Sequence, residues 1–153
     1  MSPRLFRIAA HAVGGGIGIA LMFLIANAAG EPLMLVPFAT SIVLVMGAPE
    51  SPPARPRAIL GGHLISATTG VAVAMLFGSD WWVAAVGVAI AIAIMQALDA
   101  FHPPAGISPI IATTSHASPM FILNPVAAGA VILVAYAWTF HRITGDRWPE
   151  RWY

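Results

Sequence analysis

The most chemically distinctive stretch of this sequence is DAFHPPAGISPII, residues 99–111, which sets a histidine, an aspartate and three prolines between long apolar runs. His102 can donate a hydrogen bond or take up a proton near neutral pH. An ionisable ring is costly in so apolar a chain unless it is used. We therefore expect His102 to contact a substrate or to carry a proton.

Two proline-led stretches are predicted to form short helices, over 37–46 and over 104–114. The residue before a proline avoids the helical region, whereas proline itself fits the first helical turn. Each short helix should follow an extended segment, EPLMLV at 31–36 in the first case and DAFHP at 99–103 in the second. About ten helical residues span roughly 15 Å, or half the hydrocarbon thickness of a bilayer. We predict two half-helices whose N-termini meet near the membrane midplane.

A helix N-terminus offers unpaired N–H groups and a partial positive charge, which together suit a small anion. Hydroxyl groups and a glycine surround the two predicted N-termini and would bind the same ion. The predicted substrate-binding residues are Ala39, Thr40, Ser41, His102, Ala105, Gly106 and Ser108, with Asp99, His63 and Arg57 as secondary candidates.

The composition identifies the environment of these segments. Hydrophobic residues make up 59% of the chain and charged residues 8%, with a mean hydropathy of +0.85. These values are typical of an integral membrane protein. A formal net charge of +1 indicates no nucleic-acid partner, and the absence of cysteine removes disulfides and thiolate metal sites. Four runs are long enough, or nearly so, to cross a bilayer: 8–29, 58–77, 81–98 and 124–140.

The two halves of the sequence resemble each other when one is shifted by 67 residues. The shift aligns five identical pairs: Pro37 with Pro104, Ser41 with Ser108, Ser51 with Ser118, Pro52 with Pro119, and Gly62 with Gly129. It also lays the first long run over the third and the second over the fourth, as expected for a repeat. We predict an all-α membrane protein with a single transmembrane domain over 1–153. Repeat one covers 8–77 and repeat two 81–140, each with two long helices and one half-helix.

The arginines test the topology of these segments. If all six segments cross and the N-terminus lies inside, all seven arginines fall on the cytoplasmic side, as the positive-inside rule requires. Glu31 and Asp80 then fall outside, and the tail 141–153 is cytoplasmic. The first repeat starts inside and the second outside, so the repeats are predicted to be inverted.

Other chemistries are less well supported by the sequence. Asp99 and His102 are three residues apart, but the prolines that follow end any helix there, so we expect no metal site and no cofactor. An intramembrane enzyme with these two residues as acid and base is an alternative, as is a purely structural membrane subunit. Against an enzyme, the chain has no nucleophile motif and no cofactor signature. His11, His116 and His141 lie near predicted interfaces and receive no role.

FHPPAG at 101–106 and GAPESPPARPRAILGGHLIS at 47–66 resemble the HPP family of small integral membrane proteins, named for a His-Pro-Pro triplet. The resemblance covers about 14–140. Members in chloroplasts and cyanobacteria are associated with nitrite transport, so it implies a transporter or channel, not an enzyme, with nitrite as the small-anion partner.

The sequence shows neither a plastid transit peptide nor a CBS domain, so we expect a bacterial inner membrane with both termini in the cytoplasm. A homo-oligomer in the lipid bilayer is compatible with the sequence. Channel or carrier action, the direction of transport and proton coupling stay open.

Overall fold

The computed structural model describes residues 2–28, 30 and 35–152, and these residues form helices and no β-strand. Two 3₁₀ helices cover Pro52–Ala54 and Pro103–Ile107, and a π-helical turn at Ile122–Ala127 leads into the last helix. The all-α prediction is confirmed. The α-helices are α1 (Pro3–Ala28), α2 (Leu35–Gly47), α3 (Pro56–Phe77), α4 (Trp81–Ala97), α5 (Ser108–Thr114) and α6 (Ala128–Thr144).

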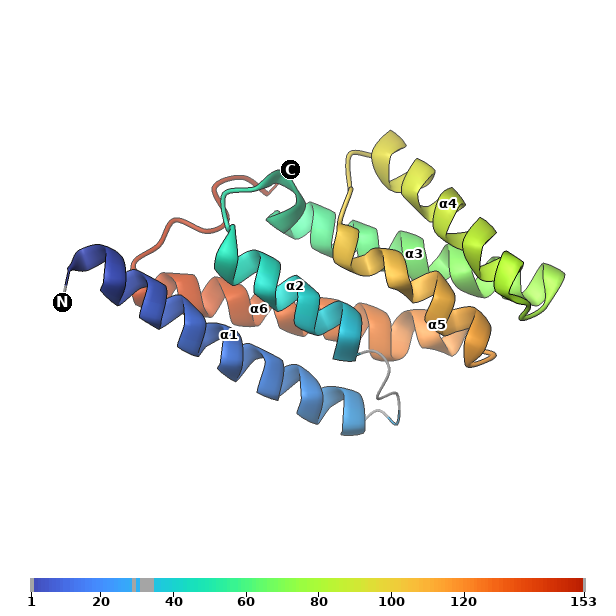
Figure 1. Cartoon of the computed structure of the whole chain (residues 1–153), viewed down its shortest axis with the longest axis horizontal. Coiled ribbons are helices and arrows are strands. Elements are labelled where there is room, and N and C mark those ends of the chain that lie inside the picture. Colours follow the sequence, from blue (N-terminus) through green and yellow to red (C-terminus); the bar gives the residue numbers. More distant parts are fainter. Residues whose placement is uncertain (1, 29, 31–34, 153) are drawn as a thin grey trace.

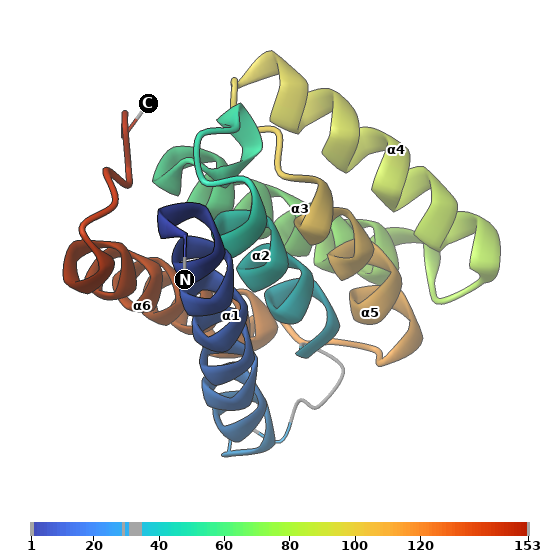
Figure 2. The same ribbon diagram turned by 60° about the vertical axis from the view of Figure 1, so that its left-hand side comes forward.

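The helices run roughly along the long axis of the molecule, and the two short ones lie inside the bundle (Figure 1). α1 and α2 pack with α6, whereas α4 and α5 pack with α3 (Figure 2). α3 and α6 also contact each other and join the two groups. The short helices α2 and α5 are therefore held between long ones, as a site inside a membrane bundle requires.

Three helices are long and apolar enough to cross a membrane, namely Arg4–Ala28, Pro56–Phe77 and Ile122–Thr144. They match three of the four long segments predicted from the sequence. The fourth, α4, is an apolar helix of 17 residues and falls just short of that length. The first predicted extended segment and Glu31 lie largely outside the described residues.

Prolines account for the main departures from the predicted helices. The second half-helix is not continuous, because Pro109 has no N–H to continue it. Ser108 instead donates its N–H to Ala105 in a tighter 3₁₀ bond, and α5 starts there. Asn124, which precedes Pro125, is non-helical with φ −134° and ψ 117°, so a kink interrupts the turn before α6. The helix then continues to Thr144, into the stretch predicted as a tail.

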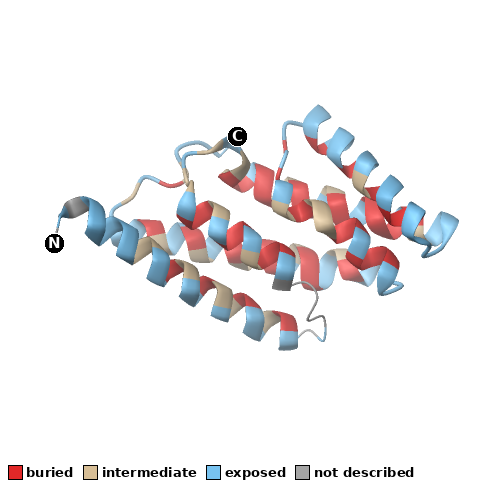
Figure 3. Ribbon diagram, viewed as in Figure 1, coloured by how far each residue is buried: buried red, intermediate tan, exposed pale blue. Residues whose placement is uncertain are grey.

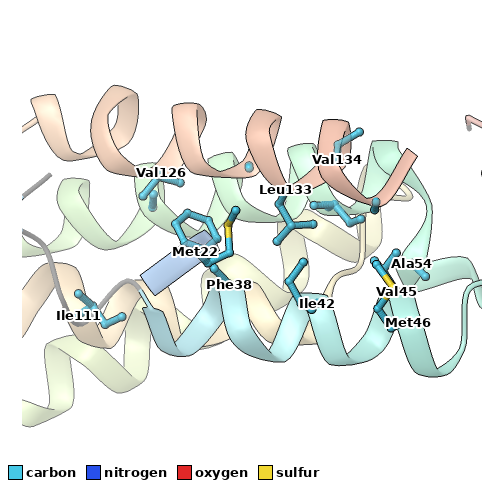
Figure 4. Packing of buried hydrophobic residues seen from close by; sticks show 14 of the residues in the cluster. Met22, Phe38, Ile42, Val45, Met46, Ala54, Ile111, Val126, Leu133 and Val134 are labelled. Carbon is cyan, nitrogen blue, oxygen red and sulfur yellow. The ribbon is translucent and has the colours of Figure 1, made fainter. Parts of the chain in front are cut away.

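The largest buried apolar cluster fills the space between α2 and α6. Phe38 and Ile42 of α2 and Leu133 of α6 are fully buried and face one another, with Met22 of α1 beside them (Figure 4). In contrast, the outward faces of α1 and α4 are largely exposed (Figure 3). Their exposed side chains include large apolar residues such as Ile17, which is typical of lipid contact.

Candidate functional site: a buried histidine and serine cluster

Three buried polar side chains from separate segments meet inside the bundle. Ser41 comes from α2, His63 from α3, and His102 from the segment before the 3₁₀ helix Pro103–Ile107, and each is 0% exposed. Ser41 Oγ lies 2.8 Å from His102 Nε2 and 3.0 Å from His63 Nε2. The two imidazole rings lie 5.2 Å apart between centroids. We refer to these three residues as the histidine-serine cluster.

The local backbone aims His102 into this cluster. Asp99 adopts a positive φ of 51° and ends α4, and the chain is then extended to His102, at φ −132° and ψ 93°. This agrees with the extended segment predicted before Pro103. His102 Nδ1 lies 2.7 Å from the carbonyl oxygen of Pro53. Because a carbonyl only accepts, Nδ1 must carry the hydrogen, and Nε2 is the acceptor of the neutral ring.

The Ser41 hydroxyl has two acceptors within reach and one hydrogen to donate. It lies 2.7 Å from the carbonyl oxygen of Pro37, one turn earlier in α2, and faces the free Nε2 of His102. If it donates to His102, all three side chains are satisfied in the neutral state, with His63 Nε2–H donating to Ser41. If it donates to Pro37, His102 must carry a second proton to bond Ser41. The hydroxyl orientation and the charge of His102 are therefore coupled.

Two buried polar atoms in the described part of the chain lack hydrogen-bond partners in this region of the sequence pattern. They are Nδ1 of His63 and Oγ of Ser108. Leaving a buried polar group unpaired costs about 1–3 kcal/mol. Such atoms are therefore candidates for binding a ligand that brings the missing donors or acceptors.

Close packing around glycines holds the cluster together. A Cβ built on Gly62 would lie only 2.5 Å from the Cβ of His102, and one built on Gly70 would lie 2.5 Å from the Cα of Pro109. The first is far inside ordinary contact distance, so α3 approaches the His102 segment as closely as its backbone allows.

Two hollows flank the cluster. A groove of about 530 Å³ lies between α2 and the His-Pro-Pro segment, lined in part by Thr40, Pro103 and Ile107. A smaller cavity of about 100 Å³ is lined by Arg55, Arg57, Asp99 and neighbouring residues. Pro53, whose carbonyl binds His102, lines both hollows.

The comparison with protein families agrees with this arrangement. A family model described as "HPP, transmembrane region" matches residues 1–149. This chain belongs to the HPP transmembrane family. The triplet His102, Pro103 and Pro104 of this HPP chain is the segment that enters the histidine-serine cluster.

Two curated relatives of this HPP chain come from Dictyostelium discoideum, and both names describe transmembrane proteins. One is 33% identical over 129 residues, which is 78% of this chain and 42% of the relative. The other is 32% identical over 125 residues, or 76% of this chain and 44% of the relative. The chain thus spans less than half the length of these relatives. No solved structure matches it.

The HPP chain brings Ser41, His102 and the secondary candidate His63 into direct contact. Ser41 lies in the second turn of α2, so the observed contact joins the start of one short helix to the middle of the other. Ser108 and Ala105 are buried close by in sequence.

The remaining candidates lie outside this contact. Thr40 is exposed, and its hydroxyl bonds the carbonyls of the preceding turn of α2. Ala39 and Gly106 are half-buried, and a Cβ added to Gly106 would meet nothing within 4 Å. Arg57 donates to the carbonyl of Leu98 at 2.7 Å.

Asp99 is exposed, and the described hydrogen bonds of His102 go to Ser41 and Pro53, not to Asp99. The acid and base pair considered for an enzyme is therefore not formed. The sequence reasoning also missed Pro53, because a backbone carbonyl leaves no trace in a residue pattern. The only available signal was the proline-rich stretch SPPARPR, which indicates a fixed irregular loop.

Proposed function

We propose that this HPP protein moves a small inorganic anion across a membrane through the histidine-serine cluster, and that the anion is nitrite. The observation that carries the proposal is a buried polar cluster inside an apolar bundle, with two polar atoms left without partners. Ionisable groups at membrane depth are expensive and usually serve transport or proton movement. Hydroxyl and imidazole donors suit a small anion, and the family resemblance selects nitrite among such ions.

The cluster is able to supply the charge that an anion needs. When Ser41 turns its hydroxyl to Pro37, His102 takes a proton and the cluster changes from neutral to a charge of +1. An anion that binds beside the unpaired atoms stabilises this charged state, since opposite charges attract strongly where water is scarce. We infer that one proton enters with one anion, so that transport is electroneutral.

The hollows on either side of the cluster support a route for the ion. The small cavity carries Arg55 and Arg57, which would attract anions at its mouth. The positive-inside rule puts this mouth and both chain ends in the cytoplasm, in the inner membrane of a bacterium. The groove beside Pro103 would then form the other approach to His102.

The packing of the helices supports the inverted repeat. Under the shift of 67 residues, α1, α2 and α3 correspond to α4, α5 and α6, and α3 at Pro56–Phe77 falls on 123–144, close to the observed Ile122–Thr144. α6 packs with α1 and α2, and α3 packs with α4 and α5, so each repeat lends its last helix to the other. A two-fold axis in the membrane plane generates this exchange, and such symmetry is typical of transporters with alternating access.

The equivalent glycines support the same symmetry. Gly62 of α3 packs against His102, at the start of the second short helix. Gly129, its counterpart before α6 continues, packs against the ring of Phe38 in the first short helix. Each repeat therefore closes on the short helix of the other through the same position.

Uptake of nitrite into liposomes holding the purified protein tests the proposal, because neither an enzyme nor a structural subunit moves the ion. Protein-free liposomes must be subtracted, since nitrous acid crosses bilayers unaided. Ser41→Ala should weaken uptake about two- to tenfold, the worth of one hydrogen bond. Thr40→Val is the matched control, because Thr40 is the neighbouring hydroxyl residue and touches neither histidine. His102→Asn should abolish most uptake, and His116→Asn should not.

Proton coupling has a separate readout. An inward proton gradient should drive uptake of nitrite without building up a membrane potential, and His102→Asn should remove the dependence on the gradient. Wild-type uptake by both Ser41→Ala and His102→Asn would move the pathway away from the cluster. Absence of uptake by the wild-type protein for nitrite and nitrate alike would reject anion transport itself.

A further inference from the structure

A second cluster of ligand-type side chains lies at the opposite end of the sequence. His11 of α1, His141 of α6 and Asp146 just after α6 each offer one ligand atom, and these atoms all lie within 4.8 Å of one another. His11 Nε2 is 2.7 Å and His141 Nδ1 is 3.5 Å from the same carboxylate oxygen of Asp146. Ligands around a tetrahedral zinc ion, with bonds of about 2.0–2.1 Å, are roughly 3.3 Å apart.

Backbone carbonyls at the end of α2 fix both rings. His11 Nδ1 lies 2.9 Å from the oxygen of Met46, and His141 Nε2 lies 3.3 Å from the oxygen of Val45. Each of these nitrogens must donate, so the other nitrogen of each neutral ring points a lone pair at Asp146. Metal-binding histidines are usually held this way, with the second nitrogen bonded to a carbonyl or carboxylate.

Two lone pairs and a carboxylate that converge repel one another unless a positive charge lies between them. A proton on His11 would bridge only His11 and Asp146. His141 is 0% exposed, and its Nδ1 has no hydrogen-bond partner among the described residues. A bound cation would satisfy all three atoms at once.

The turn after α6 builds the carboxylate into place. Gly145 adopts a left-handed φ of 81°, and the N–H of Asp146 returns to the carbonyl of His141 at 2.9 Å. Thr144 donates to the Asp146 carboxylate at 2.9 Å. Partial burial raises the pKa of Asp146, but contacts with His11 and Thr144 outweigh this and hold it below its ordinary value. Trp148 stacks near His141 and anchors the tail through Ala54.

We propose that His11, His141 and Asp146 bind a divalent transition-metal ion, with Zn²⁺ as the representative ion. Two imidazoles and one carboxylate form a common three-ligand set for such ions, and water takes the remaining position. Hollows beside His11 and beside Asp146, of about 440 Å³ and 290 Å³, give water access to the site. The ion ties α1, the end of α2, α6 and the tail together at one end of the bundle.

Titration of the purified full-length protein with Zn²⁺ tests the site, using an affinity tag without histidines and metal-free buffer. Calorimetry and elemental analysis should give one Zn²⁺ per chain. At a free Zn²⁺ concentration about 100 times the Kd, the unfolding midpoint should rise by about 5 °C or more. Co²⁺ should give the visible absorption spectrum of a site with nitrogen and oxygen ligands.

Asp146→Asn and His11→Asn should each weaken Zn²⁺ binding at least tenfold. His116→Asn and Glu150→Gln are matched controls, because both residues are exposed and lie outside the cluster, and they should bind Zn²⁺ as the wild type does. A folded wild type that binds no Zn²⁺ would overturn the proposal, as would equal binding by Asp146→Asn. The site and the transport function can fail separately, since Ser41→Ala leaves these ligands intact and Asp146→Asn leaves the histidine-serine cluster intact.

Discussion

Replacing Gly62 with alanine tests how closely α3 packs against the His102 segment. The new Cβ would lie 2.5 Å from the Cβ of His102, 3.2 Å from the oxygen of Ala100 and 3.4 Å from the sulfur of Met95. Carbon atoms make ordinary contact at about 3.5–4.0 Å, so the two segments must separate by about 1 Å. No side-chain rotation relieves the clash, because the Cβ of His102 is fixed by its backbone.

The cost of this separation follows from the same contacts. Overpacking of a well-packed core costs about 1–3 kcal/mol. A shift of about 1 Å also stretches the hydrogen bonds of His102 to Pro53 and Ser41, now 2.7 and 2.8 Å, past the limit near 3.5 Å. Each is worth about 0.5–1.5 kcal/mol. Gly62→Ala should therefore lower the free energy of unfolding by about 2–6 kcal/mol.

Reversible unfolding in detergent measures this loss, with Gly16→Ala as the matched control. Gly16 lies in α1, where an added Cβ meets nothing within 4 Å, so its substitution should leave stability nearly unchanged. A second comparison isolates the clash. Gly62→Ala should remain costly in a His102→Ala background, which keeps the Cβ, and become much less costly in a His102→Gly background. Equal stability of the two glycine variants, or equal cost in both backgrounds, would refute the packing argument.

Two further predictions concern topology and symmetry. Single-cysteine labelling of the cysteine-free chain should modify exposed positions 50 and 150 only from the cytoplasm and exposed position 79 only from outside; labelling of position 50 from outside would make the first short segment re-entrant. Gly129→Ala should destabilise the protein by about 1–3 kcal/mol, because its Cβ would lie 2.3 Å from the ring of Phe38. Phe38→Leu should recover part of that loss in an unfolding measurement, and no recovery would mean that the ring is not the obstacle.

Much of the fold could be predicted from local features of the sequence. Runs of apolar residues set α1, α3 and α6, and prolines set where the short helices begin, because both effects act within one helical turn or one span. The pairing of positions 67 residues apart also anticipated that Pro56–Phe77 and Ile122–Thr144 are equivalent helices. The departure at Pro109 has a local cause as well, a missing N–H, and a stricter use of proline chemistry would have predicted it.

The membership of the sites depended on the tertiary structure. His102 stands out in the sequence, but its partners are a serine 61 residues away and the carbonyl of Pro53, which no side-chain pattern encodes. Asp99, only three residues from His102, is turned outward by a single positive φ. His11 and Asp146 meet across 135 residues because α1 and α6 pack side by side. Sequence spacing predicts which residues share a helix face, whereas contacts between helices depend on glycine-mediated packing and on how each turn aims the chain that follows it.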